Sequence, residues 1–173
     1  MVRRLTAEEA GERIPDLSAV LIDCVDGGAC VGFLAPLGRE RADRFWHAVA
    51  DGVAAGDRML FVAEERSDGT IVGTVQIVFA RAENQPHRAD VSKLLVRRSA
   101  RSQGVGNFLM GAAEAAARAA GKTVLVLDTA SGAAERLYGR LGWKRVGEVP
   151  DYALLPDGAP CATTFFYKSL AEA

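Results

Sequence analysis

The stretch that decides the fold is Arg101-Ser102-Gln103-Gly104-Val105-Gly106. Before it, residues 91–96 form an apolar run with the β-branched and leucine content of a strand that is buried on both faces. After it, apolar residues recur with helical spacing, and Gly121 is placed to end the helix. The expected inward positions of that helix are Val105, Phe108, Leu109, Ala112, Ala116 and Ala119. The sequence therefore predicts a strand, a glycine-containing loop and a helix in succession.

This loop has the chemistry of an anion-binding site. The first turn of a helix leaves backbone N–H groups without partners and carries the positive end of the helix dipole. Gly104 and Gly106 have no Cβ atoms, so ligand oxygens can approach the backbone, and each hydrogen bond to a charged acceptor contributes about 1.5–3 kcal/mol. Arg97, Arg98 and Arg101 add positive charge beside the loop. The alternative is that the two glycines only form a tight turn.

The spacing of the glycines excludes two common phosphate-binding motifs. A dinucleotide fingerprint requires a third glycine where this chain has Leu109, and no Gly-Lys-Ser or Gly-Lys-Thr of a Walker loop follows. The remaining pattern, R-x-x-G-x-G between a strand and a helix, resembles the motif that holds the pyrophosphate of acetyl-CoA in the GCN5-related N-acetyltransferases (GNAT). Residues 137–143, Leu-Tyr-Gly-Arg-Leu-Gly-Trp, resemble a second segment of that family. Residues 26–34 and 150–158 are similar to the tabtoxin-resistance acetyltransferase and its bacterial relatives.

The resemblance implies a mixed α/β fold, in which helices flank a mostly antiparallel central sheet with one parallel pair of strands. It implies acetyl-CoA as co-substrate and no metal. The residues that match the family's cofactor contacts are Leu94, Leu95 and Val96 in the strand, Arg101, Ser102, Gln103, Gly104, Val105, Gly106 and Asn107 in the loop, and Ser131, which stands where many members carry an asparagine.

Acetyl transfer to an amine needs a base more than it needs an acid. Deprotonating an alkyl ammonium at pH 7 costs about 4.6 kcal/mol, whereas protonating the thiolate leaving group gains only about 2 kcal/mol. Asp128 ends the predicted strand 123–128, at the edge of the sheet where ligands bind, and Asp90 opens the strand before the loop. Both match acceptor-facing acidic residues of the resembled relatives. The alternatives are a helix N-cap for Asp128 and an ion pair with Arg88 or Lys93 for Asp90.

Three aromatic residues complete the candidate site. Tyr138 matches the family tyrosine that donates a proton to the departing CoA sulfur, and its alternative is a core tyrosine on its helix. By the same resemblance, Phe33 and Trp46 are expected to line the acceptor pocket together with Asp90 and Asp128. For Trp46 a place in the core is an equal alternative.

The whole chain fits one globular domain over residues 1–173, because 49% of its residues are hydrophobic and its length suffices to bury a core. A formal net charge of −1 argues against nucleic acid or an anionic membrane as a main partner. The three cysteines suggest neither a zinc site nor a disulfide framework and are expected to be buried thiols. The start of the chain lacks the apolar core of a signal peptide, so we expect a cytoplasmic protein.

The remaining elements follow from local patterns. Thr6 with Glu9 predicts a helix start after a strand at 2–5, and a second helix should end near Cys24. A helix over 39–55, two antiparallel strands at 58–64 and 71–80, a helix over 132–141 and final strands near 143–149 and 161–167 complete the expected sheet.

The predicted function is transfer of an acetyl group from acetyl-CoA directly to a primary amine of a small polar molecule, and a toxin or antibiotic is the specific possibility. Acetylation of a protein lysine or N-terminus remains open, as does a non-catalytic acetyl-CoA-binding module. Family resemblance also suggests a homodimer formed through the carboxyl-terminal strands.

Overall fold

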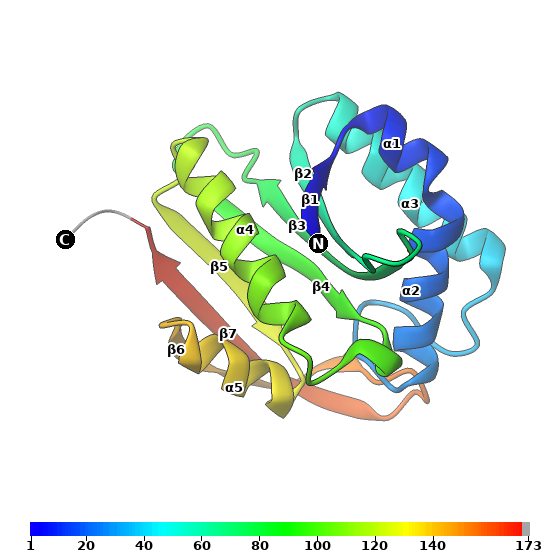
Figure 1. The fold of residues 1–173 in the computed structure, drawn as a ribbon. Coiled ribbons are helices and arrows are strands. Elements are labelled where there is room, and N and C mark those ends of the chain that lie inside the picture. Colours follow the sequence, from blue (N-terminus) through cyan, green and yellow to red (C-terminus); the bar gives the residue numbers. More distant parts are fainter. Residues whose placement is uncertain (171–173) are drawn as a thin grey trace.

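The computed structural model describes residues 1–170, which form a seven-stranded sheet with helices on both faces (Figure 1). The strands are β1 (Val2–Leu5), β2 (Arg58–Glu64), β3 (Ile71–Phe79), β4 (Arg88–Val96), β5 (Val124–Thr129), β6 (Lys144–Leu154) and β7 (Pro160–Ser169). The helices are α1 (Ala7–Glu12), α2 (Ile14–Asp26), α3 (Arg39–Ala54), α4 (Val105–Ala119) and α5 (Gly132–Arg140), with a 3-10 turn, η1, at Arg98–Ala100. The strand order is β1-β2-β3-β4-β5-β7-β6, and only β4 and β5 run parallel. The predicted mixed sheet is confirmed.

Alternating side chains of the strands build two hydrophobic clusters, one on each face of the sheet. In β2, Phe61 belongs to the cluster that α4 and α5 cover, whereas its neighbours Leu60 and Val62 belong to the cluster that α1, α2 and α3 cover. A strand that is buried on both faces has to be apolar at successive positions, which is why residues 59–63 of β2 form an unbroken apolar run.

The parallel pair β4–β5 is short. The two strands are paired only from Arg88–Val124 to Asp90–Val126, after which β4 continues for six residues to Val96 without a partner on that side. Backbone N–H and C=O groups along this edge of β4 are therefore available to a ligand.

A β-bulge in β4 accompanies this separation. The register with β3 changes between Thr74–Leu95 and Gln76–Ser92, and Lys93 adopts a φ of 52°. The buried Thr74 hydroxyl donates a hydrogen bond of 3.0 Å to the Lys93 carbonyl oxygen and so supports the irregular backbone. A bulge adds a residue to one strand and redirects its side chains.

The loop before α4 ends with Gly104 at the N-cap position, in the left-handed conformation with a φ of 81°. Glycine adopts this conformation without the steric cost that a Cβ would add. The helix spans the predicted range, and Gly121 follows it with a φ of 74°.

The predicted inward face of α4 is only partly right. Its buried residues include Leu109, Met110, Ala113 and Ala117, whereas Phe108 is 65% exposed and Ala119 is exposed. The stripe that faces the sheet runs through Leu109, Ala113 and Ala117 at i, i+4 and i+8, one position along from the predicted stripe.

Other predicted elements match closely, and β6 is the main exception. It was expected near 143–149 but runs to Leu154, because a bulge between Val149 and Ala153 lets the pairing with β7 resume. Asp151, inside the bulge, has a φ of 50°. Local sequence gives little sign of such a bulge.

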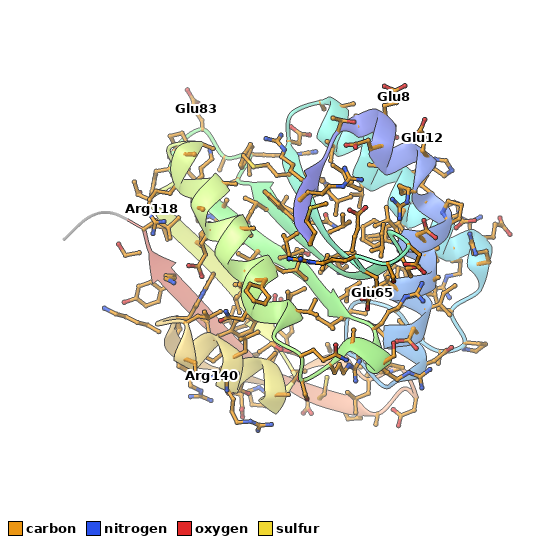
Figure 2. The ribbon with its side chains drawn as sticks, in the orientation of Figure 1. Glu8, Glu12, Glu65, Glu83, Arg118 and Arg140 are labelled. Atoms are coloured by element: carbon orange, nitrogen blue, oxygen red, sulfur yellow. The ribbon has the colours of Figure 1, made fainter. Side chains whose placement is uncertain are left out.

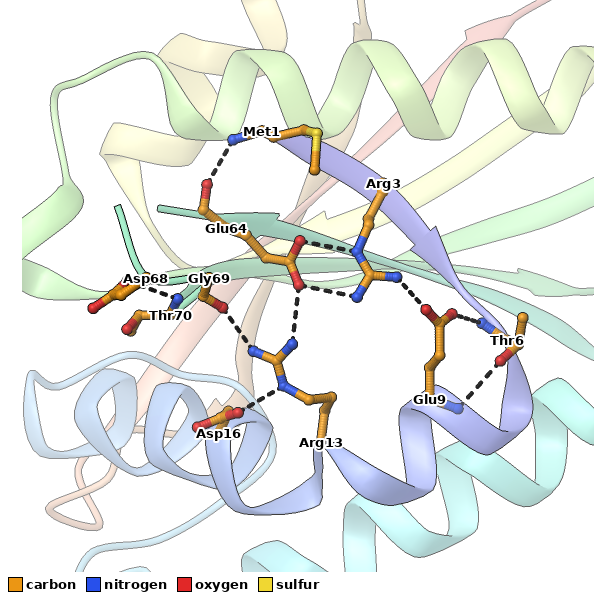
Figure 3. Close-up of polar contacts among 10 residues, drawn as sticks. All are labelled: Met1, Arg3, Thr6, Glu9, Arg13, Asp16, Glu64, Asp68, Gly69 and Thr70. Carbon is orange, nitrogen blue, oxygen red and sulfur yellow. Dashed lines mark hydrogen bonds and ion pairs between the residues drawn. The ribbon is translucent and has the colours of Figure 1, made fainter. Parts of the chain in front are cut away.

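An ion-pair network fastens the N-terminal segment to the sheet (Figure 3). The Glu64 carboxylate on β2 accepts hydrogen bonds from the guanidinium groups of Arg3 (2.9 Å) and Arg13 (3.1 Å). Arg3 also donates to Glu9, which completes the predicted capping box with Thr6 at the start of α1. These two arginines hold the pKa of Glu64 below its ordinary value.

The surface carries charges of both signs around its periphery. The labelled side chains are all exposed and come from helices α1, α4 and α5 and from two loops (Figure 2): Glu8, Glu12, Glu65, Glu83, Arg118 and Arg140. This distribution agrees with the near-zero net charge of the chain.

Candidate active site

A cleft of about 890 Å³ opens where β4 and β5 separate. We call it the central cleft; it is lined by residues within segments 27–32, 91–96, 100–107, 128–140 and 152–155. The glycine loop and the N-terminus of α4 form one part of its wall, and the loop after α2 with the end of β6 forms another. The central cleft thus joins the predicted cofactor loop to the predicted acceptor side.

Almost all of the predicted cofactor residues line the central cleft. They are Leu94, Leu95, Val96, Arg101, Ser102, Gly104, Val105, Gly106, Asn107 and Ser131. Gln103 does not line the central cleft, because its side chain turns back and donates a hydrogen bond of 3.0 Å to the Ser99 carbonyl oxygen.

These residues fit the diphosphate and pantetheine parts of acetyl-CoA. The loop offers the N-terminus of α4 with an adjacent guanidinium, since Arg101 lies in the wall of the central cleft. At Gly106 a Cβ would lie 3.1 Å from Leu137 Cδ2, so glycine allows α4 and α5 to approach closely beside the loop. The unpaired edge of β4 can bond the amide groups of an extended pantetheine arm.

Ser131 has a structural role that also bears on Asp128. The Ser131 hydroxyl accepts a hydrogen bond of 3.4 Å from the Ala134 backbone N–H and is the N-cap of α5. Asp128 is therefore not the cap of this helix, and the alternative considered for it does not hold.

Asp128 lies near the end of β5 and lines the central cleft. Desolvation in the cleft raises the pKa of its carboxyl group, the charge of Lys93 opposes that rise, and the charge of Asp90 adds to it. The side chain is nevertheless accessible to solvent, because the cleft is open on this side. A carboxylate with a raised pKa in an accessible cleft is suited to accept a proton.

Tyr138 comes from α5 and also lines the central cleft. Its ring is only 5% exposed and packs against Trp143 and Phe166, with ring centroids 5.9 and 5.7 Å away. Burial and the nearby charge of Asp128 raise the pKa of its phenol, so the hydroxyl carries its proton at neutral pH. Tyr138 combines the packing role considered as its alternative with access to the cleft.

Asp90 does not line the central cleft. Its carboxylate accepts a hydrogen bond of 2.8 Å from the Arg88 guanidinium, which is the ion pair considered as its alternative. Asp90 therefore acts on Asp128 through its charge and is not among the residues that face the cleft.

Phe33 and Trp46 are not brought into the central cleft either. Trp46 is fully buried in the cluster beneath α1, α2 and α3, and Phe33 packs edge-on against Phe45 at 5.5 Å. A fully buried indole cannot touch an acceptor, so the prediction that Trp46 lines the acceptor pocket is wrong. The helical spacing of Trp46 with the other apolar residues of α3 marks a core position.

The structure adds Lys93 and Cys30 to the cleft. Lys93 was expected only as an ion-pair partner on a strand, and no local signal marks the bulge that turns it. Cys30 lies 3.6 Å from Cys161 between sulfur atoms, and neither is fully buried, so only Cys24 fits the expectation of a buried thiol. Residues 131 apart in the chain meet only through the fold.

Residues 1–170 lack two kinds of feature. Within this part of the chain there is no group of three or more His, Cys, Asp or Glu side chains that could hold a metal ion. Among the helices described, none has the length and apolar character required to cross a bilayer.

Comparison with known proteins identifies the family. The model of the acetyltransferase (GNAT) family matches residues 29–143, which includes the glycine loop, Asp128 and Tyr138. The chain belongs to the GNAT acetyltransferase family. This GNAT protein is 36% identical over 129 residues to an uncharacterized N-acetyltransferase in the hisH-hisA intergenic region of Azospirillum brasilense, covering 73% of each chain.

Solved structures show the same GNAT fold at low sequence identity. A ribosomal-protein-alanine N-acetyltransferase from Brucella melitensis is 22% identical, with a TM-score of 0.81 over 98% of this chain and 99% of that one. A GNAT phosphinothricin acetyltransferase from Sinorhizobium meliloti, solved in complex with acetyl-CoA, is 17% identical, with a TM-score of 0.82 over 100% of this chain and 89% of that one. The family and its complexes support acetyl-CoA as the co-substrate of this GNAT enzyme.

Proposed function

We propose that this GNAT acetyltransferase moves the acetyl group of acetyl-CoA directly to the primary amine of a small polar molecule. The observation that carries the proposal is the meeting of Asp128 and Tyr138 in one cleft with the glycine loop. These groups come from β5, α5 and the start of α4, so the fold supplies a base, a proton donor and an anion site to one space.

In the proposed reaction, Asp128 accepts a proton from the acceptor ammonium and becomes a neutral carboxylic acid. The freed amine forms a bond to the thioester carbonyl carbon as the bond from that carbon to sulfur breaks. Backbone N–H groups near Leu95 and Val96 stabilise the charge that develops on the carbonyl oxygen. Tyr138 donates a hydrogen bond or its proton to the departing sulfur. The second proton that the nitrogen loses as the amide forms ends on the CoA thiol, directly or by restoring the Tyr138 hydroxyl. Acetyl-CoA supplies the activated acyl group.

Two segments that meet beside the central cleft favour a small molecule over a protein. The loop after α2 is fastened to the segment after β6 by a hydrogen bond of 2.9 Å from the Ala35 backbone N–H to the Pro156 carbonyl oxygen. The Cys30 thiol lies 3.5 Å from the Leu154 carbonyl oxygen in the same region. A protein substrate would need an open groove between these two segments.

The name of the Brucella protein keeps a protein N-terminus as the second candidate acceptor. The name of the Sinorhizobium protein supports the first, and within it we propose an amino-bearing toxin or antibiotic in a cytoplasmic setting. A homodimer formed through the carboxyl-terminal strands belongs to the same proposal.

The test is CoA release from acetyl-CoA with a panel of small primary amines, set beside peptides with a free N-terminus. We expect turnover with a small amine, lowered about 10²- to 10⁴-fold in Asp128→Asn and lowered in Tyr138→Phe without weaker acetyl-CoA binding. Asp51→Asn is the matched control, because Asp51 is an exposed aspartate of α3 that does not line the central cleft. Turnover with the peptides alone would replace the first candidate by the second.

A further inference from the structure

One charged side chain of the central cleft has no part in the proposed acetyl transfer. Lys93 lies in the bulge of β4 with a φ of 52°, and its carbonyl oxygen is held by the buried Thr74 hydroxyl. A non-glycine residue in this conformation is uncommon and costs about 1 kcal/mol or more. The bulge places the side chain in the wall of the cleft.

The ammonium group of Lys93 lies on the acceptor side of the cleft. Its Nζ atom is 5.6 Å from the centroid of the Phe45 ring, and it would be 3.7 Å from a Cβ built on Gly32. Both neighbours belong to the N-terminal half of the chain, whereas the glycine loop, which is expected to hold the cofactor, belongs to the C-terminal half. Phe45 offers only the weak attraction between a cation and an aromatic ring.

No carboxylate balances this charge. Among residues 1–170, the ion pairs within 4.0 Å do not include Lys93. Burial lowers the pKa of its ammonium group, and the charge of Asp128 opposes that change. A partly desolvated cation without a partner gains from an anion that enters the cleft.

The cleft thus presents two opposite charges to an acceptor. Asp128 offers a carboxylate from the end of β5, and Lys93 offers an ammonium group from β4, the two strands that separate to form the cleft. The two groups are near enough for each to change the pKa of the other, yet they form no ion pair of their own. A molecule with an ammonium group and an anionic group fits between them.

We propose that Lys93 binds the carboxylate of the acceptor, so that the substrate of this enzyme is an amino acid or a close analogue held as a zwitterion. The inference rests on the proposed function, in which Asp128 faces the ammonium group of the substrate. Lys93 acts as a specificity-determining residue and takes no part in proton transfer.

The experiment compares the standard amino acids with their carboxamides as acceptors. We expect kcat/KM to be at least tenfold higher for an amino acid than for its carboxamide. In Lys93→Met, kcat/KM should fall about 10- to 150-fold for the amino acid, mainly through KM, and change little for the carboxamide. Lys93→Arg should restore part of the difference. Lys144→Met is the control, because Lys144 is an exposed lysine of β6 that does not line the cleft.

Two outcomes would overturn the proposal. Equal wild-type rates with amino acids and carboxamides would show that the carboxylate is not bound. Equal losses with both acceptors in Lys93→Met and no recovery in Lys93→Arg would assign Lys93 to proton transfer or to the fold, and thermal unfolding would show which.

A binding measurement separates this proposal from the proposed function. Calorimetry of the enzyme with CoA should show tighter binding of N-acetyl amino acids than of N-acetyl carboxamides, with the preference lost in Lys93→Met. If that preference holds while no amine is acetylated, the anion site stands and the proposed function fails. If it is absent in the wild type, the anion site fails even where small amines are acetylated.

Discussion

At the scale of single residues, two pairs of similar side chains have different surroundings. Asp128 faces the central cleft, while Asp90 on the neighbouring strand is paired with Arg88. Arg101 lines the cleft, while Arg98 is paired with Asp23. Residues that look equivalent in the sequence therefore differ by position, because one of each pair lines the cleft and the other is held in an ion pair.

Replacing Asp128 should lower activity and raise stability. Because the cleft raises the pKa of Asp128, the folded state binds its proton more tightly than the unfolded state does. The stability that this proton contributes is present below the ordinary pKa of 3.8 and is lost as the pH rises through the folded-state pKa. Asp128→Asn should therefore melt at a higher temperature than the wild type at pH 7, with a difference that shrinks toward pH 4.

The activity of the wild type should depend on pH in the opposite direction. Its kcat/KM should fall as the pH drops through the raised pKa of Asp128, since only the ionised carboxylate accepts a proton. A pH profile of CoA release and melting curves of Asp128→Asn, with Asp51→Asn as the control, check both effects. A lower melting temperature of Asp128→Asn at pH 7 would contradict the assignment of Asp128 as a functional carboxylate with a raised pKa.

Arg101→Ala should weaken acetyl-CoA binding about tenfold, because one hydrogen bond to a charged group at an exposed site contributes about 1.5 kcal/mol. Acetyl-pantetheine, which lacks the diphosphate, should be used equally well by the variant and the wild type. Arg98→Ala is the matched control, since Arg98 is paired with Asp23 and does not line the cleft. A loss of the same size with acetyl-pantetheine would place Arg101 elsewhere in the site.

At the scale of elements, local rules predict where a helix begins and fail where a strand bends. The caps at Thr6 and at Gly104 follow from interactions within a few residues, so the starts of α1 and α4 were predictable. The bulges at Lys93 and Asp151 arise from the register of pairing between neighbouring strands, β4 with β3 and β6 with β7, and both were missed. Because the bulge at Lys93 was not predicted, the place of this charged residue in the central cleft was not predicted either.

The network around Glu64 fastens β1, α1 and α2 to the sheet, so its loss should destabilise the protein. Glu64→Gln removes the carboxylate that Arg3 and Arg13 share, at a cost of about 1–3 kcal/mol because these pairs are partly buried. The melting temperature should fall by about 2–12 °C at pH 7. Because the pKa of Glu64 is lowered, this contribution is present above its ordinary pKa of 4.5 and is lost as the pH falls through the folded-state pKa.

The difference in melting temperature between Glu64→Gln and the wild type should accordingly shrink in acid. Glu65→Gln serves as the control, since Glu65 is exposed and adjacent in sequence. A fall of equal size in Glu65→Gln, or a constant difference down to low pH, would argue against the network as the cause.

At the scale of the whole molecule, the sheet ends in a long and unprotected edge. β6 is the last strand in the sheet order and has 11 residues, and its exposed hydrophobic side chains include Val146 (67%) and Tyr152 (52%). Exposed edge strands of this kind readily pair with another chain. This feature supports the proposed homodimer.

We expect a dimer in analytical ultracentrifugation at micromolar concentration, and Val146→Glu should shift it toward the monomer. Phe108→Glu is a matched control, because Phe108 on α4 is similarly exposed at 65% but lies away from β6. A monomeric wild type, or dissociation by Phe108→Glu alone, would exclude β6 as the interface.

The sequence by itself determined the glycine loop, the helix that follows it and the parallel strand that ends at Asp128, because these depend on residue types at short spacings. It thereby also determined the family and the co-substrate. The tertiary structure decided which polar residues meet in the cleft: it brought Lys93 in, left Asp90 paired with Arg88 and buried Trp46 in the core. Those outcomes depend on strand register, a bulge and long-range packing, which no local pattern encodes.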